Sequence, residues 1–127
     1  MSTISDLVGK TLTSIDRYDG KYDNQLTFIC DDGEKYLMLH HSDCCEDVRI
    51  DEVFGDFSDL LNTPILDARE ETNGESHPEG FKIDYQPESF LWTFYILRTI
   101  KGSVTIRWYG TSNGYYSEGV DFEKVEF

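Results

Sequence analysis

The sequence predicts an α+β fold that is mainly antiparallel β and forms a single domain over residues 1–127. Four segments are rich in Val, Ile, Thr, Tyr and Phe, the residues that suit a pleated and half-buried surface. Short turn sequences join these segments in two pairs, as in β-hairpins. A chain of 127 residues is long enough to bury one core without disulfides or a structural metal.

The first half of the chain is expected to hold one short helix and one hairpin. The helix would span residues 4–8, with Asp6 in its first turn, where a carboxylate suits the helix dipole. The strands of the hairpin would span residues 25–30 and 34–40, joined by the turn Asp31-Asp32-Gly33.

The second half is expected to follow the same order. A second short helix would span residues 56–61, again with acidic residues in its first turn. The second hairpin would have strands over residues 90–100 and 103–109, joined by Lys101-Gly102. In the last of these strands the most apolar residues alternate with others, which is typical of a strand with one buried face. Residues 72–88 contain two glycines and two prolines without periodicity, so an exposed loop is expected there, with residues 81–85 as an added edge strand.

The two halves, residues 4–53 and 56–127, resemble a weak internal repeat. The segment from Asp6 to Leu12 aligns with the segment from Asp59 to Ile65, and each is followed by a hairpin and then by a polar segment. The polar segments span residues 40–48 and 109–120. Half of this chain could not bury its own sheet face, so a duplication predicts two similar β units in one domain, with the polar segments in equivalent places.

Charge limits the possible partners. The formal net charge is −14, from 25 acidic against 11 basic residues. Proteins bind nucleic-acid phosphates and anionic membranes through Lys and Arg, so neither is expected as a direct partner. No apolar run is long enough to span a membrane, the first ten residues lack the order of a signal peptide, and three cysteines do not make a disulfide framework. We therefore expect a cytoplasmic protein.

The acidic residues are concentrated in two stretches of seven carboxylates each, at residues 43–59 and 67–88. The simplest interpretation is a solvated surface, but a field of this strength also steers a protein toward basic surfaces. No EF-hand spacing is present, so calcium is not expected.

Two histidines and two cysteines fall within six residues, at His40, His41, Cys44 and Cys45. These are ligands that zinc selects, but adjacent strand residues point to opposite faces and no second pair is visible. A Cys–His nucleophile is also disfavoured, since the neighbouring carboxylates raise the pKa of a thiol. We therefore predict no metal, no cofactor and no enzyme activity. One of these histidines is expected as a hydrogen-bonded residue near the core.

The segment from Tyr109 to Glu118 is the most concentrated candidate for recognition. Its Asn113-Gly114 pair favours a tight turn, which would present Tyr115 and Tyr116 around a bend. A turn whose tyrosines only cover the end of the sheet remains the alternative.

Two motifs carry a resemblance to a known family. One is His-x-x-Asp-Cys-Cys-Glu, ending at Glu46, and the other is Lys-Gly-x-Val-Thr-Ile-Arg-Trp-Tyr-Gly-x-Ser-Asn-Gly-Tyr-Tyr-Ser-Glu, from Lys101 to Glu118. Over residues 36–122 the chain resembles an uncharacterised domain family of bacteriophages and their hosts. The resemblance implies a phage or prophage origin, and hence the cytoplasm of an infected bacterium, but no activity.

The leading hypothesis is an acidic binding protein that docks on and inhibits a basic, nucleic-acid-binding host or defence protein, in the manner of an anti-CRISPR protein or a DNA mimic. The residues expected at this interface are Asp43, Glu46, Asp47, Asp51, Glu52, Asp56, Trp108, Tyr109, Tyr115, Tyr116 and Glu118.

The alternative is a small-ligand domain whose polar site lies between residues 40–46 and 112–118. Its residues would be His40, Asp43, Cys44, Glu46, Ser112, Asn113, Tyr115, Ser117 and Glu118. A third possibility is a structural role in a virion, which would require an oligomer formed through an edge strand. The sequence leaves the partner and the oligomeric state open.

Overall fold

The computed structural model describes residues 2–21, 23–41, 46–78, 81, 88–114 and 117–125. Both expected hairpins are present within it. Strands β2 (Asn24–Cys30) and β3 (Lys35–Leu39) form the first, closed by a turn in which Gly33 has a φ of +90°. Strands β6 (Ser89–Thr99) and β7 (Gly102–Ser112) form the second and pair along their whole length.

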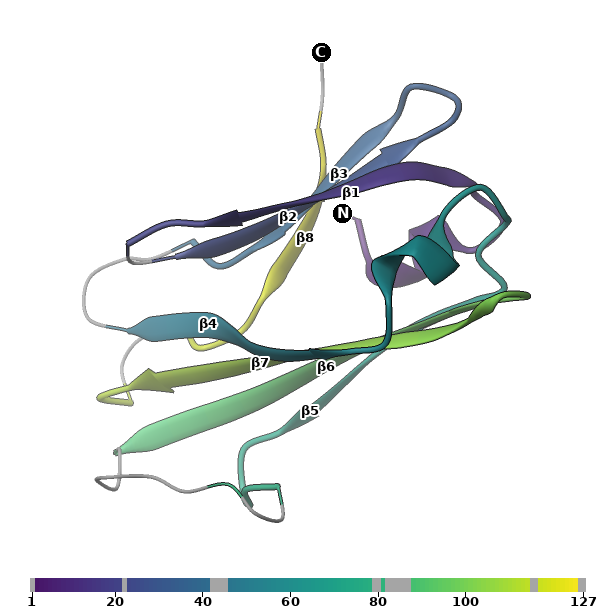
Figure 1. Cartoon of the computed structure of the whole chain (residues 1–127). Coiled ribbons are helices and arrows are strands. Elements are labelled where there is room, and N and C mark those ends of the chain that lie inside the picture. Colours follow the sequence, from purple (N-terminus) through teal and green to yellow (C-terminus); the bar gives the residue numbers. More distant parts are fainter. Residues whose placement is uncertain are drawn as a thin grey trace.

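Four further strands complete two antiparallel sheets that face each other (Figure 1). They are β1 (Leu12–Asp19), β4 (Asp47–Phe54), β5 (Asp67–Asn73) and β8 (Asp121–Lys124). One sheet has the order β1-β2-β3-β8 and the other β4-β7-β6-β5. The fold is therefore mainly antiparallel β, as the sequence predicts.

The expected helical content is wrong. In place of two α-helices the described residues contain two single 3-10 turns, η1 (Ile4–Leu7) and η2 (Phe57–Leu60). Each ends after four residues because Val8 and Leu61 are extended and the next residue, Gly9 or Asn62, has a positive φ. One turn cannot form the series of i to i−4 hydrogen bonds of an α-helix. An all-β description fits better than α+β.

The two halves follow the same order of elements: one 3-10 turn, three strands of one sheet, and a fourth strand. The fourth strand crosses to the other sheet in each case, since β4 pairs with β7 and β8 pairs with β3. Each sheet is thus a three-stranded meander from one half completed by the last strand of the other half. The crossovers, residues 40–46 and 113–120, contain most of the polar segments expected at residues 40–48 and 109–120, and the remaining residues of these segments belong to β4 and β7.

The aligned segments of the two halves also bond to each other reciprocally. Gly9 N donates to the carbonyl oxygen of Ile65 at 2.8 Å, and Asn62 N donates to that of Leu12, also at 2.8 Å. In the alignment Gly9 corresponds to Asn62 and Leu12 to Ile65, so these two bonds are equivalent. The arrangement is a property of the fold, and its origin in a sequence duplication stays a prediction.

The core lies between the sheets, where Phe28 and Met38 of one sheet face Ile106 and Trp108 of the other. Figure 1 shows both 3-10 turns at the same end of the sandwich, and they bury Leu7 and Leu60 completely there. Burial of this apolar surface is the main stabilising contribution to the fold.

The segment expected as an exposed loop is divided by the structure. Thr72 and Asn73 belong to β5, and residues 74–76 are exposed. His77, Pro78 and Phe81 are half-buried, and the rings of His77 and Phe81 pack on the outer face of the sheet that contains β6. The edge strand expected at residues 81–85 falls almost entirely outside the described residues.

Candidate functional site

His40 and Glu46 stand at the two ends of the crossover from β3 to β4, and they form a buried hydrogen bond. His40 Nε2 lies 2.9 Å from Glu46 Oε1, and His40 Nδ1 lies 2.7 Å from the carbonyl oxygen of Gly119. The two side chains are only 4% and 1% exposed. A carbonyl oxygen only accepts, so His40 Nδ1 carries a hydrogen and donates it to Gly119. This histidine therefore ties one crossover to the other.

Gly110 lets the second crossover lie directly against β7. A Cβ atom at this position would come within 2.7 Å of the carbonyl oxygen of Glu118 and 3.0 Å of Val48 Cγ2. Ser89 Oγ donates a hydrogen bond of 2.9 Å to Glu118 Oε1, which holds the same segment from the neighbouring strand.

These contacts bear on the small-ligand site expected from the sequence. His40, Glu46 and Oε1 of Glu118 are hydrogen-bonded within the protein, whereas Glu118 Oε2 is buried without a hydrogen-bond partner among the described residues. The hydroxyls of Ser112 and Ser117 accept from the backbone of Gly114 and Gly119, at 3.0 and 3.2 Å, as in ordinary turns. Asn113 is exposed beside Gly114. The remaining expected residues, Asp43, Cys44 and Tyr115, lie outside the described part of the chain.

The carboxylates of β4 lie on the outer face of their sheet and are paired with the protein's own arginines. Arg49 Nε donates to Asp47 Oδ1 at 2.9 Å. Arg107 donates from Nε and Nη2 to Asp51 Oδ2 at 2.8 and 2.6 Å, and its Nη2 lies 3.6 Å from Glu52 Oε2. Much of the negative charge that the sequence places on this strand is therefore compensated locally.

Asp56, also expected at the interface, has a local structural role. Its Oδ1 accepts a hydrogen bond of 2.9 Å from Ser58 N and so caps η2. That bond from the backbone lowers the pKa of the Asp56 carboxyl group.

Two residues expected at a partner interface are not on the surface. Trp108 lies on the inner face of β7, is 1% exposed, and donates its indole N–H to Met38 Sδ at 3.3 Å. Glu46 is buried with His40. Neither can contact a partner, because strand alternation and the crossover direct them into the core. Tyr109 lies on the opposite, outer face, and Tyr115 and Tyr116 fall outside the described residues.

Tyr109 belongs to an aromatic cluster that was not predicted from the sequence. The His77 ring stacks on Phe90 and Phe81 with ring centroids 4.1 and 5.1 Å apart, and Trp92 Nε1 donates to His77 Nδ1 at 3.1 Å. The Trp92 and Tyr109 rings lie 4.3 Å apart. Large apolar residues on both faces of β6 were the available signal, since they indicate that something covers the outer face as well. Nothing in the sequence marks His77 as the cover.

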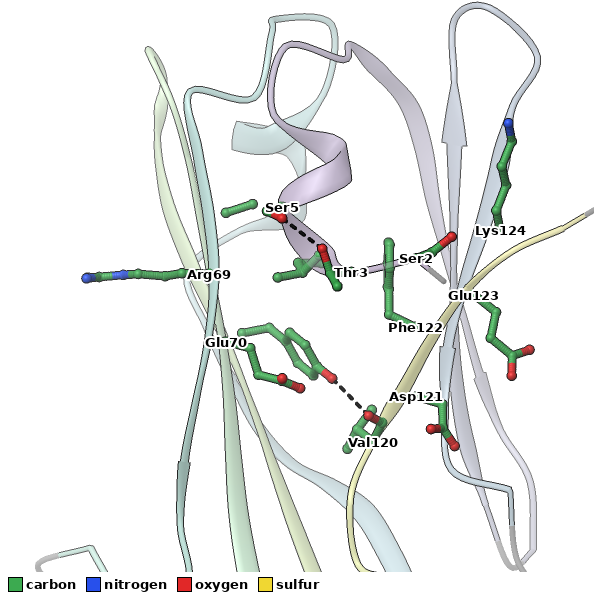
Figure 2. A pocket seen from close by; sticks show the side chains of 13 residues that line it. Ser2, Thr3, Ser5, Arg69, Glu70, Val120, Asp121, Phe122, Glu123 and Lys124 are labelled. Atoms are coloured by element: carbon green, nitrogen blue, oxygen red, sulfur yellow. Dashed lines mark hydrogen bonds between the residues drawn. The ribbon is translucent and has the colours of Figure 1, made fainter.

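A cleft opens between the free edges of β5 and β8, with a volume of about 810 Å³ (Figure 2). Five consecutive residues from Val120 to Lys124 line one side, Ala68 to Glu70 line the other, and the N-terminal segment Ser2 to Ser5 borders it. Tyr95 also contributes to the lining.

Tyr95 and Glu70 give the interior of the cleft its polar character. They are cross-strand partners in register and so share the inner face of their sheet. Tyr95 is 1% exposed and its hydroxyl donates to the carbonyl oxygen of Val120 at 3.3 Å. Burial, and next the carboxylate of Glu70, raise the pKa of Tyr95 far above its usual range. Figure 2 shows Glu70 pointing into the cleft while Arg69 points away from it.

The carboxylates near the cleft are less compensated than those of β4. Among the described residues, no Lys or Arg lies within 4.0 Å of Asp67, Glu70 or Asp121. Glu123, at the rim, lies 2.6 Å from His41 Nε2. Asp67 and Glu70 belong to the acidic stretch at residues 67–88, but nothing in the sequence indicates that this stretch lies across a cleft from β8.

The described residues contain neither a cluster of metal-binding side chains nor a helix suited to a membrane. No group of three or more His, Cys, Asp or Glu side chains in this part of the chain is placed to hold a metal ion. In the same residues no helix has the length and apolar character needed to cross a membrane.

Two facing antiparallel sheets with exchanged fourth strands and an acidic surface define an all-β domain without a recognisable catalytic centre among the described residues. The chain belongs to a domain family of unknown function, DUF7448, which matches residues 5–122. This confirms an uncharacterised domain family, and the phage origin stays an expectation. Comparisons with curated proteins and with solved structures give no match.

Proposed function

We propose that this protein is an acidic binding domain that docks on a basic partner protein and blocks it. The observation that supports the proposal most is that the basic side chains of this protein are largely paired with its own carboxylates. At least six of the ten basic side chains in the described residues lie within 4.0 Å of a carboxylate of the same chain, namely Lys10, Arg17, Arg49, Arg69, Arg107 and Lys124. Most positive charges are thus ion-paired within the protein. The electrostatic field outside the protein is therefore set by the 14 excess carboxylates.

A nucleic-acid-binding protein is the partner class that fits this field. Such a protein presents Lys and Arg to phosphates, and a surface of carboxylates can occupy the same basic channel. The resemblance to phage proteins suggests that the partner is a host or defence protein of the infected bacterium. Inhibition then follows from competition, because the acidic domain and the nucleic acid use one site.

The small-ligand alternative has less support. It needs the polar groups of residues 40–46 and 112–118 to be available, yet most of those described are hydrogen-bonded within the protein, and the exception, Glu118 Oε2, is buried. The cleft described above is lined by other residues.

Affinity capture from a nuclease-treated bacterial lysate tests the proposal. We expect basic, nucleic-acid-binding proteins to be retained at low salt, to be released by about 0.5 M NaCl, and to be displaced by added double-stranded DNA. The enzyme or binding activity of the captured protein should then fall when the acidic domain is added in excess. Retention that is insensitive to both salt and DNA would contradict electrostatic docking.

A further inference from the structure

We propose that an extended, basic segment of the partner protein binds in the cleft by adding a strand to the free edge of β8, with a Lys or Arg side chain directed at Glu70. This rests on the proposed function and gives it a location and a binding mode.

The free edge of β8 is the first observation. Within the described part of the chain β8 pairs only with β3, so its other side has no strand. That side borders the cleft over the whole strand, since each residue from Val120 to Lys124 lines it. An unpaired strand edge presents a row of backbone N–H and C=O groups that an extended peptide can pair with.

The position of Glu70 is the second observation. It occupies an inward-facing place on β5, in register with Tyr95, where a closed sandwich would have an apolar side chain. Because the sheets are open here, its carboxylate is exposed inside the cleft (Figure 2). A single carboxylate beside a strand edge selects a cationic side chain at one position of an added strand.

Charge also decides against a second copy of this chain as the occupant. Both cations that line the cleft are directed elsewhere, since Lys124 is paired with Glu34 and Arg69 points away from the cleft, so its charge comes from the carboxylates of Glu70, Asp121 and Glu123. Pairing β8 of one molecule with β5 of another would bring these carboxylates together, and like charges opposite each other destabilise a strand pair. A basic segment would instead place Lys or Arg side chains opposite these carboxylates, which stabilises a strand pair. The mixed lining, with Phe122 and Ile4 beside the hydroxyls of Thr3 and Ser5, also suits an extended chain with alternating apolar and polar residues.

The test uses the full chain and a capped peptide of alternating Val and Lys residues. We expect saturable binding, with the amide hydrogen exchange of Asp121 to Lys124 slowed on addition of the peptide. A second peptide has the same sequence with alternate backbone nitrogens methylated, so that its charge is kept and its strand pairing is lost. It should bind at least about tenfold more weakly.

Two protein variants complete the experiment. Glu70→Gln should weaken binding of the unmodified peptide about five- to tenfold, since it removes the carboxylate that points into the cleft. Asp16→Asn removes the same charge from exposed β1, at the other edge of the sheet that contains β8, and should leave the affinity nearly unchanged.

The outcomes separate the two proposals. Equal binding of both peptides, or equal effects of both variants, would overturn strand addition at the cleft while leaving a general electrostatic function standing. Absence of binding to the basic peptide, together with salt-dependent capture of basic proteins from lysate, would also overturn the cleft proposal alone. Failure of both experiments would overturn the binding function itself.

Discussion

The carboxylate of Glu46 and the imidazole of His40 meet in the interior at a distance of 2.9 Å, six positions apart in the chain, and the same imidazole reaches the backbone of Gly119 on its other side. One side chain thus joins the two crossovers that exchange strands between the sheets. A buried histidine with both ring nitrogens bonded has little freedom to act as a ligand or a base. Its position indicates a role in holding the two halves together.

Replacing Glu46 by Ala should therefore destabilise the protein. The substitution leaves His40 Nε2 without its carboxylate partner in the interior, and a loss of about 1–3 kcal/mol in the free energy of unfolding is expected. Urea unfolding measures it. Glu75→Ala, at an exposed position, is the control and should change stability by less than about 0.5 kcal/mol. If the two substitutions have equal effects, the His40–Glu46 bond is not a stabilising contact.

The neighbouring histidine should show a pH dependence. His41 Nε2 lies 2.6 Å from Glu123 Oε1, and this hydrogen bond raises the pKa of His41 above its ordinary value of 6.5. The pair joins the end of β3 to β8. Since the pKa in the folded state is higher than in the unfolded state, the stabilisation is fully present below pH 6.5 and is lost as the pH rises through the raised pKa.

An NMR titration of the His41 ring checks this prediction. The midpoint should lie above 6.5 in the wild-type protein and should fall toward that value in Glu123→Gln. The two side chains are 60% and 47% exposed, so the difference in midpoint should shrink in high salt. An unchanged midpoint in the variant would show that Glu123 is not the cause.

The sequence predicts the central strands and fails at the outer ones, for physical reasons. β2, β3, β6 and β7 are rich in apolar and β-branched residues because they lie in the middle of the sheets or contribute most of the core. In β4 the alternation of Val48 and Ile50 is interrupted by a bulge before Glu52, so Val53 falls out of phase. β5 buries only Ala68, and its other residues are polar or charged, a composition typical of a loop.

The candidate site shows the same limit. His40 and Glu46 could be identified because they lie six residues apart in a polar segment of unusual composition. The cleft could not, since residues 2–5, 68–70 and 120–124 meet only because β8 leaves its own half to join the other sheet. Trp108 and Tyr109 were both expected at the interface, but adjacent strand residues point to opposite faces, and Trp108 shares the buried face with Val104 and Ile106.

Gly110 should not tolerate a side chain. Ala at this position would bring its Cβ within 2.7 Å of the backbone oxygen of Glu118, so the second crossover must move away from β7. We expect a destabilisation of about 1–3 kcal/mol from this overpacking, measured by thermal or urea unfolding. Gly119→Ala is the matched control in the same crossover, because a Cβ there has only an ordinary contact of 3.5 Å with Ser117 Oγ. Equal stability of the two variants would mean that the close approach of the crossover to β7 is not a constraint.

His77 should be needed for the cover over the outer aromatic face. His77→Ala removes the ring that stacks on Phe90 and Phe81, and it takes away the acceptor of the Trp92 indole N–H. Stability should fall by about 1–2 kcal/mol. The chain has only two tryptophans, so the indole N–H resonances can be followed one by one in NMR spectra. The resonance of Trp92 should shift and exchange faster with water, while that of Trp108, in the core, stays unchanged. His77→Phe keeps a stacking ring without the acceptor, and it should recover part of the stability while leaving the Trp92 resonance shifted. If the Trp92 resonance is the same in wild type and in both variants, the hydrogen bond to His77 is absent in solution.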